Sequence, residues 1–241
     1  MRAETRHSLK EDKFSRATIN AAEKTVHWTV EHKSKLITAA AIVVVVAAAA
    51  LATWYYLQNQ DLKASTEFGK ALRTLNAQIR PAGVPAQPDV ASFSSAKDRA
   101  TEAHKEFQAI VDKYPHTRAS EFARYFAGMT ASQLGDNAAA ERDLKNVASS
   151  HHEDVSALAK FALASVYRKS NRDKNAIDMY QQLIAKPTRS VGKATAQLEL
   201  ADLYEEKHQP QEAKRIYEQV QKENPNSEVA SLASSKLAGL K

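Results

Sequence analysis

The sequence predicts an all-α protein: an N-terminal transmembrane helix, then an α-solenoid of about four helix pairs with a C-terminal capping helix. Three observations carry this prediction. Only 6 glycines and 7 prolines occur among 241 residues, a composition that favours helices. Residues 36–57, LITAAAIVVVVAAAALATWYYL, contain no charge. Beyond them, one pattern of small, aromatic and aliphatic residues recurs four times, which is typical of repeat proteins.

The uncharged stretch at residues 36–57 is long enough to cross a membrane. As a helix it measures about 33 Å, against about 30 Å of hydrocarbon in a bilayer. Trp54, Tyr55 and Tyr56 stand at one end, where aromatic rings favour the headgroup layer. Basic residues are concentrated in residues 1–35, so the positive-inside rule predicts a cytoplasmic N-terminal tail. We therefore expect a single-pass membrane protein, with residues 36–57 in contact with lipid and the C-terminal domain outside the cytoplasm.

A cleaved signal peptide is the alternative interpretation of this stretch. The tripeptide Ala50-Leu51-Ala52 before Thr53 fits a small-x-small cleavage site. The 35-residue leader and the apolar run are both longer than such peptides usually have, which favours the uncleaved anchor. In the basic tail, residues 15–35 are expected to form an amphipathic helix. This helix would lie along the membrane or a partner, or merely continue the span.

Four segments of the remaining chain align without gaps. They begin at Ala103, Ala140, Ala176 and Ala213, which are 37, 36 and 37 residues apart. In each, a large residue follows four positions later and an aliphatic residue three positions after that. The large residues are Phe107, Leu144, Tyr180 and Tyr217, and the aliphatic ones are Ile110, Val147, Leu183 and Val220. This spacing places all three on one helix face.

Each of the last three segments is preceded by a second predicted helix with a small residue near its centre. Gly128, Ala164 and Ala201 hold that position, and a small residue lets two helices approach closely. Before the first segment, residues 58–95 are expected to supply the first solenoid helix and a Pro-rich connection. The stripe on that helix comprises Phe68, Leu72, Leu75 and Ile79. Residues 96–241 are expected to hold the repeats and a C-terminal capping helix.

These marks together resemble the tetratricopeptide repeat, with a period slightly above the usual 34 residues. The resemblance implies a solenoid whose first helices line a concave surface that binds protein partners. Ten residues fall at the inward positions of that register: Phe122, Tyr125, Met129, Leu158, Phe161, Arg168, Lys169, Leu198, Asp202 and Glu205. The alternative for Phe122, Tyr125 and Phe161 is that their rings are simply core between repeats.

Little in the sequence indicates other chemistry. The chain has no cysteine, so disulfides and thiolate metal sites are excluded. The cluster HHED at 151–154 lies in a predicted turn, where four adjacent residues cannot all face one point, so we expect no metal site there. A Gly-rich phosphate loop is absent, and no catalytic constellation or cofactor site is expected. The net charge of +6 is spread over mixed signs, which does not indicate nucleic-acid binding.

The layout of basic tail, single span and compact repeat domain also resembles the ancillary subunit of the bacterial Sec translocon. That resemblance implies a protein of the bacterial inner membrane whose periplasmic domain is a scaffold that contacts translocon subunits, periplasmic chaperones or exported chains. Related envelope scaffolds of cell-wall, division or outer-membrane assembly machinery share the layout. A self-assembling structural membrane protein is a further possibility, although the span lacks a GxxxG motif.

Overall fold

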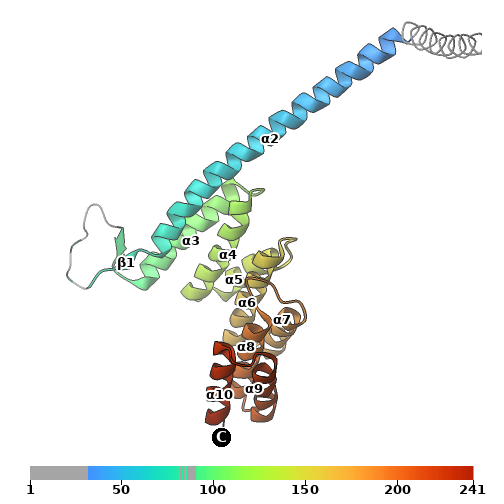
Figure 1. Cartoon of the computed structure of the whole chain (residues 1–241). Helices are drawn as coiled ribbons and strands as arrows, with labels where there is room; N and C mark the ends of the chain where they lie inside the picture. Colours follow the sequence, from blue (N-terminus) through green and yellow to red (C-terminus); the bar gives the residue numbers. More distant parts are fainter. Residues whose placement is uncertain (1–31, 82, 84, 86–90, 241) are drawn as a thin grey trace, which may run out of the picture. The chain divides into compact units, whose positions relative to one another are not determined.

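The computed structural model describes residues 32–81, 83, 85 and 91–240. In this part the chain forms nine α-helices and one pair of short strands, which confirms the predicted all-α class (Figure 1). In chain order the elements are α2 (Lys33–Leu75), β1 (Gln78–Ile79), β2 (Ser92–Phe93), α3 (Ala96–Lys113), α4 (Arg118–Leu134), α5 (Asn137–Ala148), α6 (Glu153–Lys169), α7 (Asp173–Ala185), α8 (Lys193–Glu206), α9 (Pro210–Glu223) and α10 (Glu228–Gly239). The amphipathic helix expected in the tail falls outside the described residues, apart from its last few.

Helix α2 contains the long apolar stretch. Its most apolar 18-residue window has none of its residues buried inside the protein. The hydroxyls of Thr38 and Thr53 donate to carbonyl oxygens four residues earlier, at 2.9 and 2.8 Å, so these polar groups are satisfied within the helix, as a lipid environment requires. By length and composition this helix can span a membrane, as an anchor or as a signal sequence.

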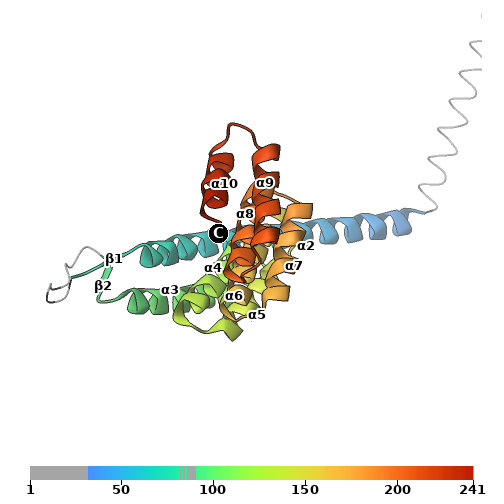
Figure 2. The ribbon, with the colours of Figure 1, turned by 90° about the horizontal axis from the view of Figure 1, so that it is seen from below.

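The chain divides between Gln58 and Asn59 into two compact units. In the second unit each helix packs chiefly against the helices before and after it in the sequence (Figures 1 and 2). The pairs are α4 with α5, α6 with α7, and α8 with α9, and α10 follows as a cap on α9. The part of α2 beyond Asn59 forms the first pair with α3, since Ala64 and Ala71 are buried in one cluster with Ala103 and Phe107. This neighbour-to-neighbour order is that of a solenoid.

Local signals explain where these helices begin and turn. Side chains of Ser95, Thr117, Asp136 and Ser227 accept hydrogen bonds from backbone N–H groups at the starts of α3, α4, α5 and α10, as good N-caps do. Each turn inside a pair contains a residue with positive φ. These are Gly135 (88°), Asn171 (54°) and His208 (56°), which lie 36 and 37 residues apart. The turn geometry therefore repeats with the helices.

The predicted repeat residues form the core. The large residues Phe107, Leu144, Tyr180 and Tyr217 and the aliphatic residues three positions later are all at most 2% exposed. Opposite them, the small residues permit close approach. A Cβ placed on Gly128 would lie 2.7 Å from Leu144 Cγ and 3.3 Å from the Ala140 carbonyl oxygen. Because both neighbours are held in the core, α4 and α5 can lie this close only with glycine at position 128.

The first helix ends earlier than the sequence pattern indicates. Phe68, Leu72 and Leu75 pack against the cluster around Phe107 as expected, but the assignment of Ile79 to the same helical stripe is wrong. Asn76 donates its side-chain amide to the Leu72 carbonyl at 2.9 Å, and α2 ends at Leu75. Ile79 lies instead in β1, 46% exposed, and pairs in parallel with Phe93 of β2.

Polar side chains also join one repeat to the next. Glu141 of α5 accepts from Arg172 at 2.6 Å, across the boundary to the following pair, and from Lys145 at 2.7 Å within its own helix. Lys207 pairs with Asp173 at 2.9 Å across the next boundary, whereas Lys186 pairs with Glu153 at 2.7 Å within the α6–α7 pair. The partners in these three inter-helix pairs lie 31–34 residues apart, close to one repeat period.

We predict that Gly128→Ala destabilises the protein. The added methyl group overpacks the α4–α5 contact, at a cost of about 1–3 kcal/mol, which outweighs a gain in helix propensity of about 1 kcal/mol. Thermal unfolding followed by helical circular dichroism should show a lower Tm. The matched control is Gly69→Ala, where the nearest atom to the new Cβ is Arg73 Nη1 at 3.9 Å; it should keep or raise Tm. If Gly128→Ala is neutral, the close approach is not a constraint.

We also predict an acid-sensitive contribution from Glu141. Hydrogen bonds from Arg172 and then Lys145 lower the pKa of Glu141 from 4.5 to about 2. The folded state therefore binds fewer protons at this site between these values, so its stabilising effect is present above pH 4.5 and is lost as pH falls toward 2. Denaturant unfolding of the wild type should weaken more over this range than that of Glu141→Gln. Glu212→Gln, at an exposed carboxylate, is the control and should follow the wild type.

Candidate partner-binding face

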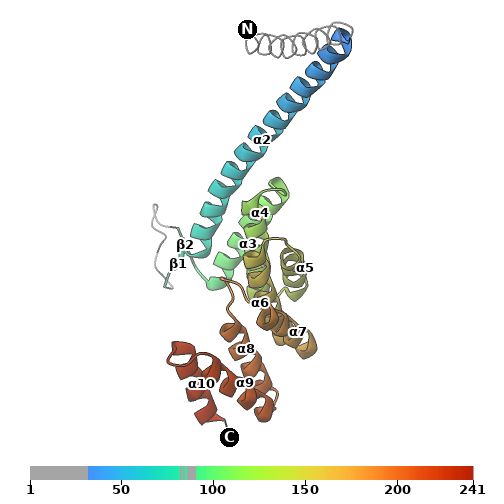
Figure 3. The ribbon, with the colours of Figure 1, turned by 45° about the vertical axis from the view of Figure 1, so that its right-hand side comes forward.

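The ten residues predicted to face a partner lie on the first helices of three successive pairs. Phe122, Tyr125 and Met129 are on α4; Leu158, Phe161, Arg168 and Lys169 are on α6; Leu198, Asp202 and Glu205 are on α8. We call this set the A-helix face. Figure 3 shows α4, α6 and α8 following one another through the second unit. That these residues line a concave surface stays a prediction.

Most apolar residues of the A-helix face are partly buried, so that they contact the core and remain partly accessible. Phe122, Tyr125, Leu158 and Phe161 are partly buried and pack against the largest core cluster, and Leu198 packs in the same way against the C-terminal cluster. Each therefore keeps part of its side chain accessible. Met129 differs, because 41% of it is exposed. Large hydrophobic residues this exposed are few among the described residues beyond the apolar stretch.

Ring contacts connect the face to the first helix pair. The Phe122 ring centroid lies 6.4 Å from that of Phe68 on α2, and Phe161 meets Tyr180 edge-on at 6.0 Å. Sequence reasoning missed Phe126, whose ring stacks on Phe107 at 5.3 Å and touches Tyr125 at 5.2 Å. Its place beside Tyr125 in the motif ARYFAG was the available signal.

The charged members of the face are mostly engaged within the domain. Arg168 donates to Glu199 at 3.2 Å and also binds Glu206, both on α8. Sequence reasoning missed these two carboxylates, although Glu206 stands close to one repeat period after Arg168. The ion pairs with Glu206 raise the pKa of Arg168 and lower that of Glu206. Of the two charges predicted to meet a partner on α6, Arg168 therefore holds α6 against α8.

Asp202 and Glu205 have partners of the same kind. Both carboxylates accept from the Tyr217 hydroxyl of α9, and Lys236 of α10 pairs with Asp202 at 2.9 Å. Burial, followed by the hydrogen bond to Asp202, raises the pKa of Tyr217 above its ordinary range. Lys169 is exposed. It has no ion-pair partner in the described part of the chain.

The cluster at 151–154 does not converge on one point. All four side chains are exposed. His152 Nδ1 lies 2.8 Å from Glu121 Oε2, Glu153 pairs with Lys186, and Asp154 accepts from the Ser190 N–H at 3.2 Å. Within the described residues no group of three or more His, Cys, Asp or Glu is placed to hold a metal ion.

Comparison with known families gives two matches. Residues 27–179 match the family described as tetratricopeptide repeat-like domain, and residues 195–227 match the tetratricopeptide repeat. No curated protein matches the chain. Members of repeat families of this kind act generally as non-catalytic scaffolds for protein–protein interaction. Because the first match covers more than half of the chain, the protein belongs to the tetratricopeptide repeat-like domain family.

Proposed function

We propose that this protein is a membrane-anchored scaffold of the bacterial inner membrane. Residues 36–57 hold it in the bilayer with a cytoplasmic N-terminus, and the repeat domain binds protein partners in the periplasm. The observation that carries the proposal is the A-helix face, where α4 carries the exposed Met129 with the partly buried rings of Phe122 and Tyr125, and α6 carries the ring of Phe161. Exposed apolar side chains that gather on one face mark interaction sites.

One finding supports an anchor over a signal peptide. The family match begins at residue 27 and continues through the apolar stretch into the repeats. Because one family model covers both the apolar stretch and the repeats, we interpret the apolar stretch as part of the mature protein and not as a removed leader.

The proposed partners follow from the architecture. A periplasmic domain tethered beside the membrane is well placed to meet translocon subunits, periplasmic chaperones or exported chains. Clients from cell-wall, division or outer-membrane assembly machinery are the alternative, and so is a second copy of this chain. The A-helix face suits a partly apolar segment of any of these proteins, because it combines the exposed Met129 and partly buried aromatic and aliphatic side chains with the exposed charges of Lys169 and Glu205.

Topology is tested first. With tags at both termini, membranes are extracted with alkaline carbonate and spheroplasts are digested with protease. We expect a full-length protein that stays in the membrane and loses only its C-terminal tag. A soluble product beginning near Thr53 would disprove the anchor while leaving the repeat domain a candidate scaffold.

The A-helix face is tested with a matched pair of charge substitutions. Met129→Glu places a charge on the face, whereas Leu232→Glu places one on α10, at a residue 48% exposed. Both sites are exposed, so the free energy of unfolding of each variant should lie within about 0.5 kcal/mol of the wild-type value. We expect Met129→Glu to lose roughly tenfold in partner binding, since a charge facing an apolar contact costs more than 1.4 kcal/mol. Leu232→Glu should bind as the wild type does.

The partner for this measurement is identified by photo-crosslinking from position 129 in intact cells, followed by mass spectrometry. Recovery of translocon or chaperone subunits supports the leading proposal, and recovery of cell-wall or division proteins supports the alternative. A product with the mass of two chains indicates self-assembly. Equal binding by Met129→Glu and Leu232→Glu would remove the A-helix face from consideration.

A further inference from the structure

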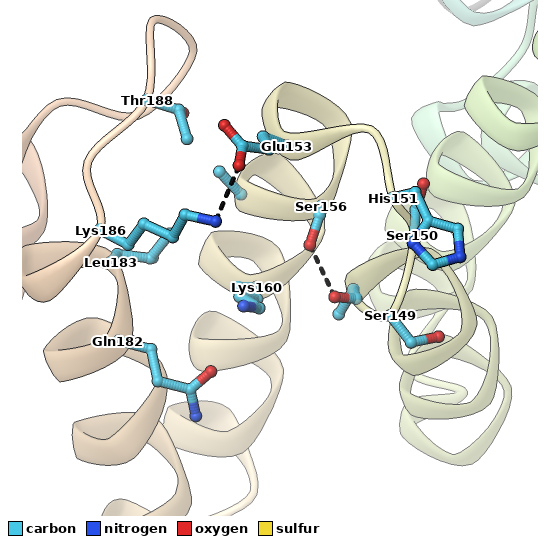
Figure 4. A pocket seen from close by; sticks show the side chains of 12 residues that line it. Ser149, Ser150, His151, Glu153, Ser156, Lys160, Gln182, Leu183, Lys186 and Thr188 are labelled. Carbon is cyan, nitrogen blue, oxygen red and sulfur yellow. Dashed lines mark hydrogen bonds and ion pairs between the residues drawn. The ribbon is translucent and has the colours of Figure 1, made fainter.

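A second possible binding site lies away from the A-helix face, in a pocket between α5, α6 and α7. Its volume is about 340 Å³, within the range of small-ligand pockets. Figure 4 shows its walls: Ser149 and His151 come from the end of α5 and the following turn, Lys160 from α6, and Gln182 and Lys186 from the end of α7. None of these residues has a role in the function proposed above.

Lys160 is the unusual residue in this pocket. Several other lysines in the described residues have no ion-pair partner, and all of those are exposed: Lys33, Lys35, Lys63, Lys97, Lys169, Lys174 and Lys222. Lys160 also has no ion-pair partner among the described residues, yet it is half-buried. An ammonium group that has no counter-charge in the protein remains available to pair with an anion. An anionic ligand in the pocket would supply that partner.

The remaining lining indicates which anion fits. Lys186 is already paired with Glu153 at 2.7 Å, so Lys160 leaves the pocket with one uncompensated positive charge when His151 is neutral. A carboxylate carries one negative charge, whereas a phosphate group carries up to two. Ala157 and Leu183, which are 4% and 2% exposed, supply apolar lining for a short carbon chain beside the charged group.

Hydrogen-bond donors for a carboxylate are available as well. Ser150 Oγ accepts from the His152 N–H at 2.9 Å, and its own proton has no acceptor in the described structure. The Gln182 side chain has no hydrogen-bond partner among the described residues and projects toward the pocket in Figure 4. A carboxylate can accept from an ammonium group and from neutral donors at the same time.

We propose that this pocket binds an organic carboxylate, held by the ammonium group of Lys160. The carboxylate has two possible sources: a small free acid, or the C-terminus of a peptide chain. The site is independent of the A-helix face and does not require residues 36–57 to be an anchor. Its failure would therefore leave the proposed function untouched.

The test follows Lys160 directly in the full-length protein in detergent micelles. Reductive ¹³C-methylation keeps the charge of the lysines and gives each an NMR signal, and that of Lys160 is assigned by its absence in Lys160→Arg. The probes are N-acetyl-Ala-Ala, its C-terminal amide and propionate. We expect a saturable shift of the Lys160 signal with N-acetyl-Ala-Ala, propionate or both, and none with the amide.

Variants separate the site from general charge effects. Lys160→Met should weaken binding of the acid at least tenfold, as loss of a charge-assisted contact does, with the other lysine signals as readout. Lys174→Met, at an exposed lysine of α7, is the matched control and should bind as the wild type.

Binding of propionate as tight as that of N-acetyl-Ala-Ala identifies a free small acid, and tighter peptide binding identifies a C-terminus. Equal binding of acid and amide, wild-type binding by Lys160→Met, or no saturable shift with either acid overturns the proposal.

Discussion

The repeat domain depends on how closely the two helices of each pair can approach. Gly128, Ala164 and Ala201 occupy that position in three pairs, with Ala140, Ala176 and Ala213 opening the helices opposite; all of the alanines are fully buried. With so little side-chain volume between the helices, Leu144, Tyr180 and Tyr217 can lie across the contact. Dense packing of this kind makes a small change in volume costly. The spacing of the pairs, and hence the position of every residue on the A-helix face, follows from this approach.

Electrostatic contacts then set how one pair meets the next. Arg172 with Glu141, Lys207 with Asp173, and Arg168 with Glu199 all cross a boundary between pairs. Individual ion pairs at a surface contribute little to stability. Their geometry is nevertheless directional, because an arginine fork meets a carboxylate in few orientations. We interpret these pairs mainly as a means of fixing rotation between neighbouring repeats, while apolar burial supplies most of the stability.

The sequence predicted the repeat helices well because their signal is local and recurs. Ala103, Phe107 and Ile110 share one helix face, and three further segments repeat that spacing, so each supports the others. The end of α2 could not be predicted in this way. The spacing of Ile79 continues the helical stripe, yet in the structure Ile79 lies in a strand and pairs with Phe93, 14 positions later. That pairing depends on a connection with no periodic pattern.

The sequence predicted which helices carry the A-helix face, but not which of its charged residues bond within the domain. The repeat register placed its ten residues on α4, α6 and α8, but could not indicate that Arg168, Asp202 and Glu205 bond within the domain. Their partners lie on other helices, and helix rotation decides which oxygen lies within reach. The same limit applies to Lys160, because the lack of a counter-charge becomes visible only when every nearby carboxylate has been placed.

The hydrophobic interior is divided rather than continuous. One cluster joins α2, α3 and α4, a second extends from the end of α4 to α8, and a third joins α8, α9 and α10. Helix α10 buries only Ala233 completely, so its attachment is the weakest in this series. Amide hydrogens should therefore exchange with solvent fastest at the C-terminal end and slowest near α6, where neighbours cover both sides. Such a gradient lets the terminal helices open and reclose while the central repeats keep their structure. The domain can therefore adjust its C-terminal end to a partner without unfolding as a whole.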